Sequence, residues 1–133
     1  MMFALLFISR RFFMNQKLDD EINEVVRLIT IEKRLGKTSI TKEDADFVKA
    51  LADTKHYPRA EYVLARMYLC GYQMEQDNAM GMKYLARSSR HASYDIQLKI
   101  AYIYQVIGEY KKISKVLERA LEDCKYLNLH ICM

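Results

Sequence analysis

The fold is decided by the phrase Leu64-Ala65-x-x-Tyr68, which returns as Ile100-Ala101-x-x-Tyr104, 36 residues further along the chain. In each copy a small residue follows a large aliphatic one, and a tyrosine comes three positions later on the same side of a helix. A small residue at that position lets a second helix approach closely. A phrase that returns after about 20–50 residues is typical of stacked helical hairpins. The sequence therefore predicts an all-helical protein.

The residues around the repeated phrases predict where the helices begin and end. The chain has 133 residues with only one Pro and four Gly, which favours long helices over a sheet with many turns. Thr41-x-x-Asp44 forms a capping box, Pro58 is an early helical residue, and Asp77 is an N-cap. The predicted helices cover residues 17–35, 42–54, 58–70, 77–90, 94–107 and 109–124, with Gly36, Gly71 and Gly108 ending three of them.

The first predicted helix has apolar residues at helical spacing, from Leu18 through Ile22 to Ile29. Its acidic residues, including Asp19 and Glu24, fall in the expected first turns, where the helix dipole favours negative charge. We interpret them as stabilising the start of a helix rather than as a metal or substrate site.

The chain divides into three predicted regions: an N-terminal arm (1–16), one helical domain (17–124) and a C-terminal cap (125–133). Within residues 1–13, the apolar run from Met1 to Ile8 is too short to span a bilayer, and the segment lacks the features of a signal peptide. Three interpretations remain open for it. The true start could be Met14, the segment could be a packing arm, or it could be a weak anchor at a membrane surface.

Charge and cysteine content narrow the class of protein further. The net charge is +4, but residues 14–60 carry nine basic and nine acidic side chains, and residues 61–133 carry ten and eight. No stripe of basic residues is seen in the sequence, so no nucleic-acid partner is expected. The three cysteines are odd in number and unmatched in spacing, which favours a reducing, cytoplasmic location.

No catalytic site and no cofactor are predicted. Cys124 and His130-x-Cys132 offer nitrogen and sulfur ligands, but they lack the C-x-x-C spacing of a zinc site and a clear fourth ligand. Cys70 could pair with a histidine as a nucleophile, yet it ends a helix, where the dipole disfavours a thiolate. We therefore expect neither a metal site nor an enzyme.

Part of the chain resembles the Sel-1-like repeat, a branch of the tetratricopeptide-like α-solenoid family. The resemblance rests on Ala60-x-x-x-Leu64-Ala65-x-x-Tyr68-x-x-Gly71, then Met74-x-x-Asp77 and Tyr84-Leu85. The chain departs from the repeat pattern by having Ala65 and Gln73 in place of Gly, Gly81 in place of Ala, and Ser88-Ser89 in place of an Ala pair. The second copy, ending in Ala120-Leu121, looks more like a plain tetratricopeptide repeat.

The resemblance implies a right-handed α-solenoid of about three hairpins that binds protein and has no chemistry of its own. It also implies that the first helix of each hairpin lines a concave face. Tyrosine and arginine often dominate the energy of protein interfaces. The predicted partner-binding residues are Arg59, Tyr62, Arg66, Leu69, Tyr102, Gln105 and Val106. The alternative for the tyrosines is half-buried packing between helices.

The function that follows is a non-catalytic protein–protein interaction module with one protein partner. By analogy with small stand-alone repeat proteins, we hypothesise a bacterial immunity protein that binds and neutralises a toxin domain. The alternative is an adaptor or regulatory subunit that scaffolds a larger assembly. The sequence does not indicate the partner's identity or the oligomeric state.

Overall fold

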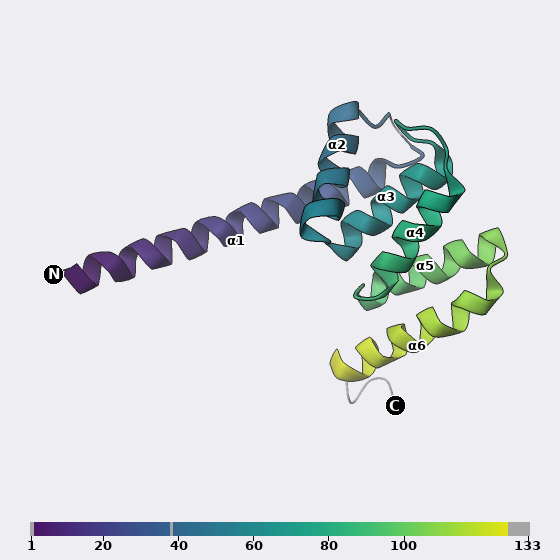
Figure 1. Cartoon of the computed structure of the whole chain (residues 1–133). Helices are drawn as coiled ribbons and strands as arrows, with labels where there is room; N and C mark the ends of the chain where they lie inside the picture. The colour runs from purple at the N-terminus through teal and green to yellow at the C-terminus, as the bar shows by residue number, and fades with distance from the viewer. Residues whose placement is uncertain (1, 38, 128–133) are drawn as a thin grey trace. The chain divides into compact units, whose positions relative to one another are not determined.

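The protein is all-helical throughout the part that the structure describes. The structure is a computed structural model that describes the backbone of residues 2–37 and 39–127 and the side chains of residues 14–37 and 39–122. Its elements are α1 (Met2–Arg34), α2 (Lys42–Ala50), the π-helix η1 (Leu51–Lys55), α3 (Pro58–Cys70), α4 (Asn78–Ser89), α5 (Tyr94–Ile107) and α6 (Tyr110–Leu127) (Figure 1). No strand occurs in these residues, so the predicted all-α class is confirmed. None of the described helices combines the length and the apolar character needed to cross a bilayer.

The chain forms two compact units, Met1–Ser39 and Ile40–Met133. The first contains α1, which begins at Met2 and not near residue 17 as the sequence predicted. No proline or glycine separates residues 2–16 from the periodic segment, so nothing stops the helix from extending. Asp19 and Glu24 therefore lie inside the helix, and their interpretation as first-turn charges is wrong.

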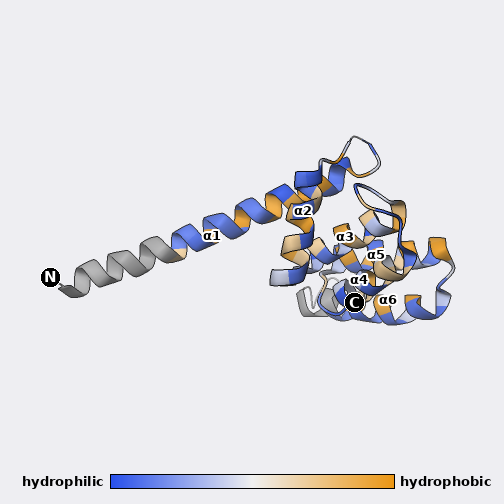
Figure 2. Cartoon of the chain, turned by 45° about the horizontal axis from the view of Figure 1, so that its top comes forward, coloured by the Kyte–Doolittle hydropathy of each residue, from blue (hydrophilic) through white to orange (hydrophobic). Residues whose placement is uncertain are grey.

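The apolar stripe predicted for this helix is open to solvent along part of its length. Leu18, Ile22 and Val26 are about half exposed. In Figure 2, hydrophilic and hydrophobic segments alternate along the described part of α1. Helical spacing thus identified the helix correctly, but it did not identify a buried face.

In the second unit, local signals set several helix ends as predicted, but the helix predicted for 42–54 is divided into α2, which ends at Ala50, and the π-helix η1, and α6 extends to Leu127 rather than to residue 124. Thr41 and Asp44 form a reciprocal capping box, with each side chain bonded to the other residue's backbone N–H. The side chain of Asp77 accepts a hydrogen bond from Met80 N–H at 3.1 Å. The helices α3 and α5 both end at a glycine with positive φ, Gly71 at 75° and Gly108 at 83°.

The two copies of the repeated phrase occupy equivalent places in two hairpins. α3 packs mainly against α4, and α5 packs mainly against α6 (Figure 1). Leu64 and Ala65 are fully buried in the first hairpin, as are Ile100 and, nearly, Ala101 in the second. Figure 1 also shows α5 running beside the α3–α4 hairpin, and α3 and α5 contact one another directly.

The α3–α4 hairpin depends on a close approach at Gly81. A Cβ atom placed on Gly81 would lie 2.6 Å from Cγ of Leu69 and 3.3 Å from the carbonyl oxygen of Ala65. The first distance is well inside van der Waals contact, so a side chain at this position would require the Leu69 side chain to move or the helices to separate. The Ala65 of the repeated phrase and Gly81 thus form the two sides of one contact.

A buried polar network joins the two hairpins at the end of α4. Ser88 donates to the carbonyl oxygen of Pro58 at 2.6 Å. Ser89 donates to Oε1 of Gln97 at 3.1 Å, and Nε2 of Gln97 donates to the carbonyl oxygen of Ser89 at 2.6 Å. Nη1 of Arg119 donates to Ser89 Oγ at 2.6 Å. The serine pair that departs from the repeat pattern therefore ties α4 to α3, α5 and α6.

Replacing Gly81 by Ala should lower the free energy of unfolding by about 1 kcal/mol. Overpacking costs about 1–3 kcal/mol, and this exceeds the gain of about 1 kcal/mol in helix propensity. Denaturant unfolding of the parent and Gly81→Ala measures the difference. The control is the same substitution in a Leu69→Ala background, where the clash is relieved and the loss should shrink. A Gly81→Ala protein as stable as its parent would contradict the close-contact interpretation.

Candidate functional site

The surface between α3 and α5 has a groove of about 420 Å³, lined by side chains from both helices. Tyr62 and Arg66 of α3 form one wall. Leu98, Lys99, Tyr102 and Ile103 of α5 form the other. The sequence predicted Tyr62, Arg66 and Tyr102 for one binding face, and the structure brings these three together. The sequence analysis did not predict three of the lining residues: Leu98, Lys99 and Ile103. Leu98 is one turn before Tyr102 and Ile103 directly follows it, so their nearness to Tyr102 could have indicated them.

The groove is built from equivalent positions of the two repeats. Residues 36 positions apart correspond in the two copies, so Tyr62 corresponds to Leu98 and Arg66 to Tyr102. The guanidinium of Arg59 likewise forms an ion pair with the corresponding residue Asp95, at 3.2 Å. Burial opposes the charge on Asp95, but hydrogen bonds from Ser93 and the charge of Arg59 hold its pKa below the ordinary value. Arg59 therefore connects the two helices at one end of the groove.

The two tyrosines of the groove differ in what they can do. Tyr62 has only 4% of its surface exposed, so its ring forms the floor of the groove and supports the fold. The guanidinium carbon of Arg66 lies 5.7 Å from the centre of that ring, in a cation–π arrangement. Tyr102 is 67% exposed and is available for contact with another molecule. For Tyr62 the burial favours the alternative of packing between helices, whereas Tyr102 has the exposure that a contact residue needs.

An exposed apolar stripe extends the groove along α5. Its members are four positions apart, which places them on one side of the helix. All four are at least 40% exposed: Tyr94, Leu98, Tyr102 and Val106. The predicted residue Gln105 is also exposed and is next to this stripe. A contiguous exposed apolar surface on a soluble protein typically marks an interaction site.

Leu69 lies elsewhere than predicted. Its Cγ and Cδ2 atoms occupy the place where a Cβ of Gly81 would lie, so the side chain belongs to the α3–α4 contact. The predicted residues of α3 are Arg59, Tyr62, Arg66 and Leu69, and the last of them, Leu69, faces α4. The members of this stripe are spaced by 3, 4 and 3 residues, so the stripe drifts around the helix, since these intervals average fewer than the 3.6 residues of one turn.

A second polar cluster lies where η1, α3 and α4 meet. Buried Glu61 pairs with Nε of Arg87 at 3.0 Å, and burial raises the pKa of Glu61 although Arg87 opposes that effect. Nη2 of Arg87 also donates to Nδ1 of His56 at 2.8 Å. The hydroxyl of Tyr84 donates to Oδ1 of Asp53 at 2.7 Å. These side chains form hydrogen bonds and an ion pair with one another across three elements, so we interpret the cluster as stabilising the fold.

His56 has an unusual backbone within this cluster. It has a φ of 53° and directly follows the π-helix, a combination that is uncommon for a residue other than glycine. Its bond to Arg87 and the bond from Tyr84 to Asp53 hold the chain in this conformation. We therefore interpret the strain as the cost of the turn into Pro58, where α3 begins.

The structure describes only some of the residues that the sequence offered for metal binding or thiol chemistry. Among the described residues, no group of three or more His, Cys, Asp and Glu side chains could hold a metal ion. The side chain of Cys124 and all of His130 and Cys132 lie outside the described residues. Cys70 is an exposed free thiol at the end of α3, and His56 is bonded to Arg87.

Comparison with known proteins gives no further guide to the site. No family model, no curated protein and no solved structure matches this chain. The resemblance to Sel-1-like repeats therefore stays a prediction from the sequence.

Replacing Tyr84 by Phe should lower the free energy of unfolding at pH 7 by about 1 kcal/mol, because Asp53 loses its hydrogen-bond donor. Burial, together with the nearby Asp53, raises the pKa of Tyr84 to about 12. The protonated phenol is thus favoured in the folded state, and its stabilisation holds up to pH 10 and is lost as the pH rises toward 12.

The Tyr84→Phe protein should accordingly lose less stability than the parent between pH 9 and pH 11. Denaturant unfolding at these pH values measures both slopes. The exposed Tyr110, changed to Phe, is the matched control and should leave the slope unchanged. Equal alkaline slopes for the parent and Tyr84→Phe would contradict the assigned role.

Proposed function

We propose that this protein is a non-catalytic protein-interaction module that binds one protein partner through the groove between α3 and α5. The observation that carries the proposal is the exposed apolar stripe of α5. Its members Leu98 and Tyr102 line the groove, and Tyr62 and Arg66 of α3 form the opposite wall. Apolar surface next to a planar cation is the composition of interface hot spots.

The groove also specifies the chemistry of the partner. Its lining side chains include the cations of Arg66 and Lys99 and no carboxylate. The complementary segment is an apolar side chain that enters the groove, flanked by acidic residues. Charge complementarity of this kind raises the association rate and selects among partners.

The architecture we propose is a right-handed α-solenoid, in which the α3–α4 and α5–α6 hairpins are successive Sel-1-like or tetratricopeptide-like units. Two features support it: the pairing of Arg59 with the corresponding Asp95, and the groove lined by corresponding residues. In such a stack the first helix of each unit lines one continuous surface. The groove would be the part of that surface between two units.

For the biological role, we propose an immunity protein that covers a toxin domain, by the analogy drawn from the sequence. A partner that is toxic when produced alone, and harmless together with this protein, would support that role. A partner that is harmless by itself would favour the adaptor role instead. Either role requires the same groove.

Replacing Tyr102 by Ala should weaken partner binding by about 1–3 kcal/mol and leave the fold's stability nearly unchanged, since the ring is largely exposed. The partner is captured with the tagged full-length protein, identified by mass spectrometry and titrated against each variant. Arg66→Gln should weaken binding by a similar amount.

The matched control is Tyr110→Ala, because Tyr110 is 68% exposed and does not line the groove. Charge reversal at Lys111, also outside the groove, should leave partner binding unchanged. A partner that binds the Tyr102→Ala protein as well as the parent would exclude this groove as the binding site. A loss of binding with the Lys111 variant instead would place the partner on α6.

A further inference from the structure

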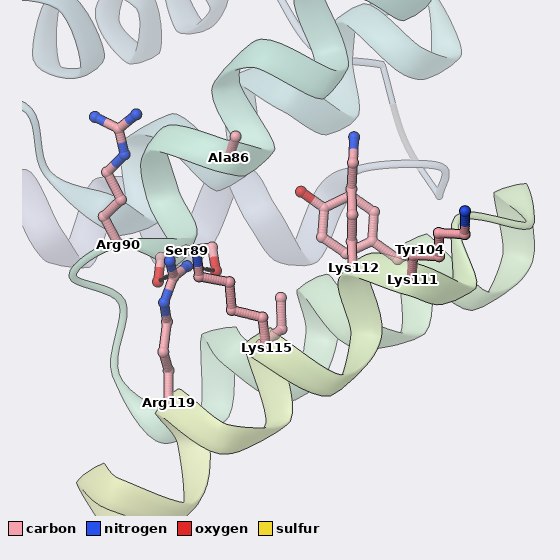
Figure 3. Close-up of a pocket in the computed structure, with 9 residues that line it drawn as sticks. Ala86, Ser89, Arg90, Tyr104, Lys111, Lys112, Lys115 and Arg119 are labelled. Atoms are coloured by element: carbon pink, nitrogen blue, oxygen red, sulfur yellow. Dashed lines mark hydrogen bonds between the residues drawn. The ribbon is translucent and has the colours of Figure 1, made fainter.

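Five basic side chains surround a second hollow, of about 290 Å³, formed by α4, α5 and α6. They are Arg90, Lys111, Lys112, Lys115 and Arg119, and Tyr104 of α5 completes the wall (Figure 3). None of the described side chains that line it is acidic. We call this site the basic hollow.

The basic residues of α6 meet here because of their spacing. Lys111, Lys115 and Arg119 are four residues apart and so share one side of the helix. Figure 3 shows Lys115 and Arg119 reaching from α6 toward Ser89 at the end of α4. Oε2 of Glu109 lies 4.0 Å from Nζ of Lys112, and both of these side chains are about half exposed. The positive charges of the hollow are thus close together.

Arg119 is held in a fixed orientation at the hollow. Its Nη1 donates to the carbonyl oxygen of Ser89 at 3.1 Å and to Oγ of Ser89 at 2.6 Å. Within the described part of the chain, its Nε and Nη2 donate no hydrogen bond. A guanidinium anchored through one nitrogen presents its remaining donors without losing further side-chain entropy.

Tyr104 supplies a second and independent observation. Its side chain is 98% buried, with a relative exposure of 2%. Its hydroxyl forms no hydrogen bond with the described residues, and in Figure 3 it is turned toward the α4 side of the hollow. Burial raises the pKa of Tyr104 although the charge of Arg119 opposes that effect, so the hydroxyl keeps its proton and is a donor. The hydroxyl atom itself is not sealed off from solvent, so at the hollow it is a donor for which a bound ligand can supply the acceptor.

We propose that the basic hollow binds a small soluble molecule that carries two linked phosphate groups. Lysine ammonium groups, an arginine fork and a phenol all donate hydrogen bonds to phosphate oxygens. The hollow lies at the lower end of the range of about 300–1,000 Å³ for small-molecule sites, so the ligand is small. Two phosphates supply enough negative charge to balance most of the five cations.

This site is separate from the proposed partner groove. None of its lining residues lines the groove between α3 and α5. The two proposals can therefore fail independently, and the test below needs no protein partner.

The test is calorimetric titration of the full-length protein with inorganic pyrophosphate and with inorganic phosphate, at constant ionic strength. We expect pyrophosphate to bind more tightly than phosphate and to raise the melting temperature of the parent. Lys115→Gln should weaken binding about tenfold or more, as expected for the loss of a charge-assisted hydrogen bond.

Tyr104→Phe separates a ligand contact from a structural role. Because the hydroxyl has no partner in the described protein, its removal should leave the melting temperature without ligand unchanged or higher, yet weaken pyrophosphate binding several-fold. Lys49→Gln is the matched charge control, because Lys49 is an exposed residue of α2 and the substitution removes the same charge. It should bind within twofold of the parent.

Three results would overturn the proposal. The first is no detectable pyrophosphate binding by the parent. The second is equal weakening by Lys115→Gln and Lys49→Gln, which would indicate a response to net charge alone. The third is binding to anionic lipid vesicles or to single-stranded RNA without binding to pyrophosphate, because an extended charged surface would then replace the enclosed site.

Discussion

At Gly81 the backbone of α4 lies so close to α3 that a single methyl group would overlap the side chain of Leu69. Much of the second unit depends on this contact. It sets the spacing of the α3–α4 hairpin, and the end of that hairpin carries Ser88 and Ser89, whose hydrogen bonds connect to Pro58, Gln97 and Arg119. A wider spacing would move the serine pair away from α5. Both candidate sites would change, because α5 forms a wall of each.

Helix ends in the second unit could be predicted from the sequence because their causes are local. A capping box needs two residues three positions apart, and a left-handed C-cap needs one glycine. Thr41 with Asp44, Gly71 and Gly108 behave in this way, and none of them requires knowledge of the tertiary fold.

The start of α1 could not be predicted by the same rules. Residues 2–16 contain no proline or glycine, so the apolar periodicity that begins at Leu18 marked a change of pattern within a helix and not its start.

The candidate groove was partly predictable because it follows the repeat. Corresponding positions 36 residues apart bring Tyr62 beside Leu98 and Arg66 beside Tyr102, which the repeated phrase already implied. The burial of Tyr62 and the packing of the Leu69 side chain against α4 could not be predicted, since both depend on how closely two helices pack. The basic hollow was missed for a different reason. Counted along the chain, the charges of residues 61–133 nearly cancel, but the hollow gathers Arg90, from the end of α4, with Lys111, Lys112, Lys115 and Arg119 of α6, and none of its lining side chains is acidic.

The helix α5 shows how one short segment can serve two surfaces. Tyr102 and Tyr104 are two residues apart, which corresponds to a rotation of about 200° around a helix, so they lie on nearly opposite sides. Tyr102 faces the groove shared with α3, and Tyr104 faces the hollow shared with α4 and α6. Gln97 and Ile100 lie on the Tyr104 side of the helix and Ala101 lies beside them; all three are buried and hold α5 in place. A molecule bound in the basic hollow would contact the hairpin on the side away from the partner groove. Any coupling between the two sites must therefore pass through the packing of α5 itself, and through the bonds that Ser89 makes with Gln97 and Arg119.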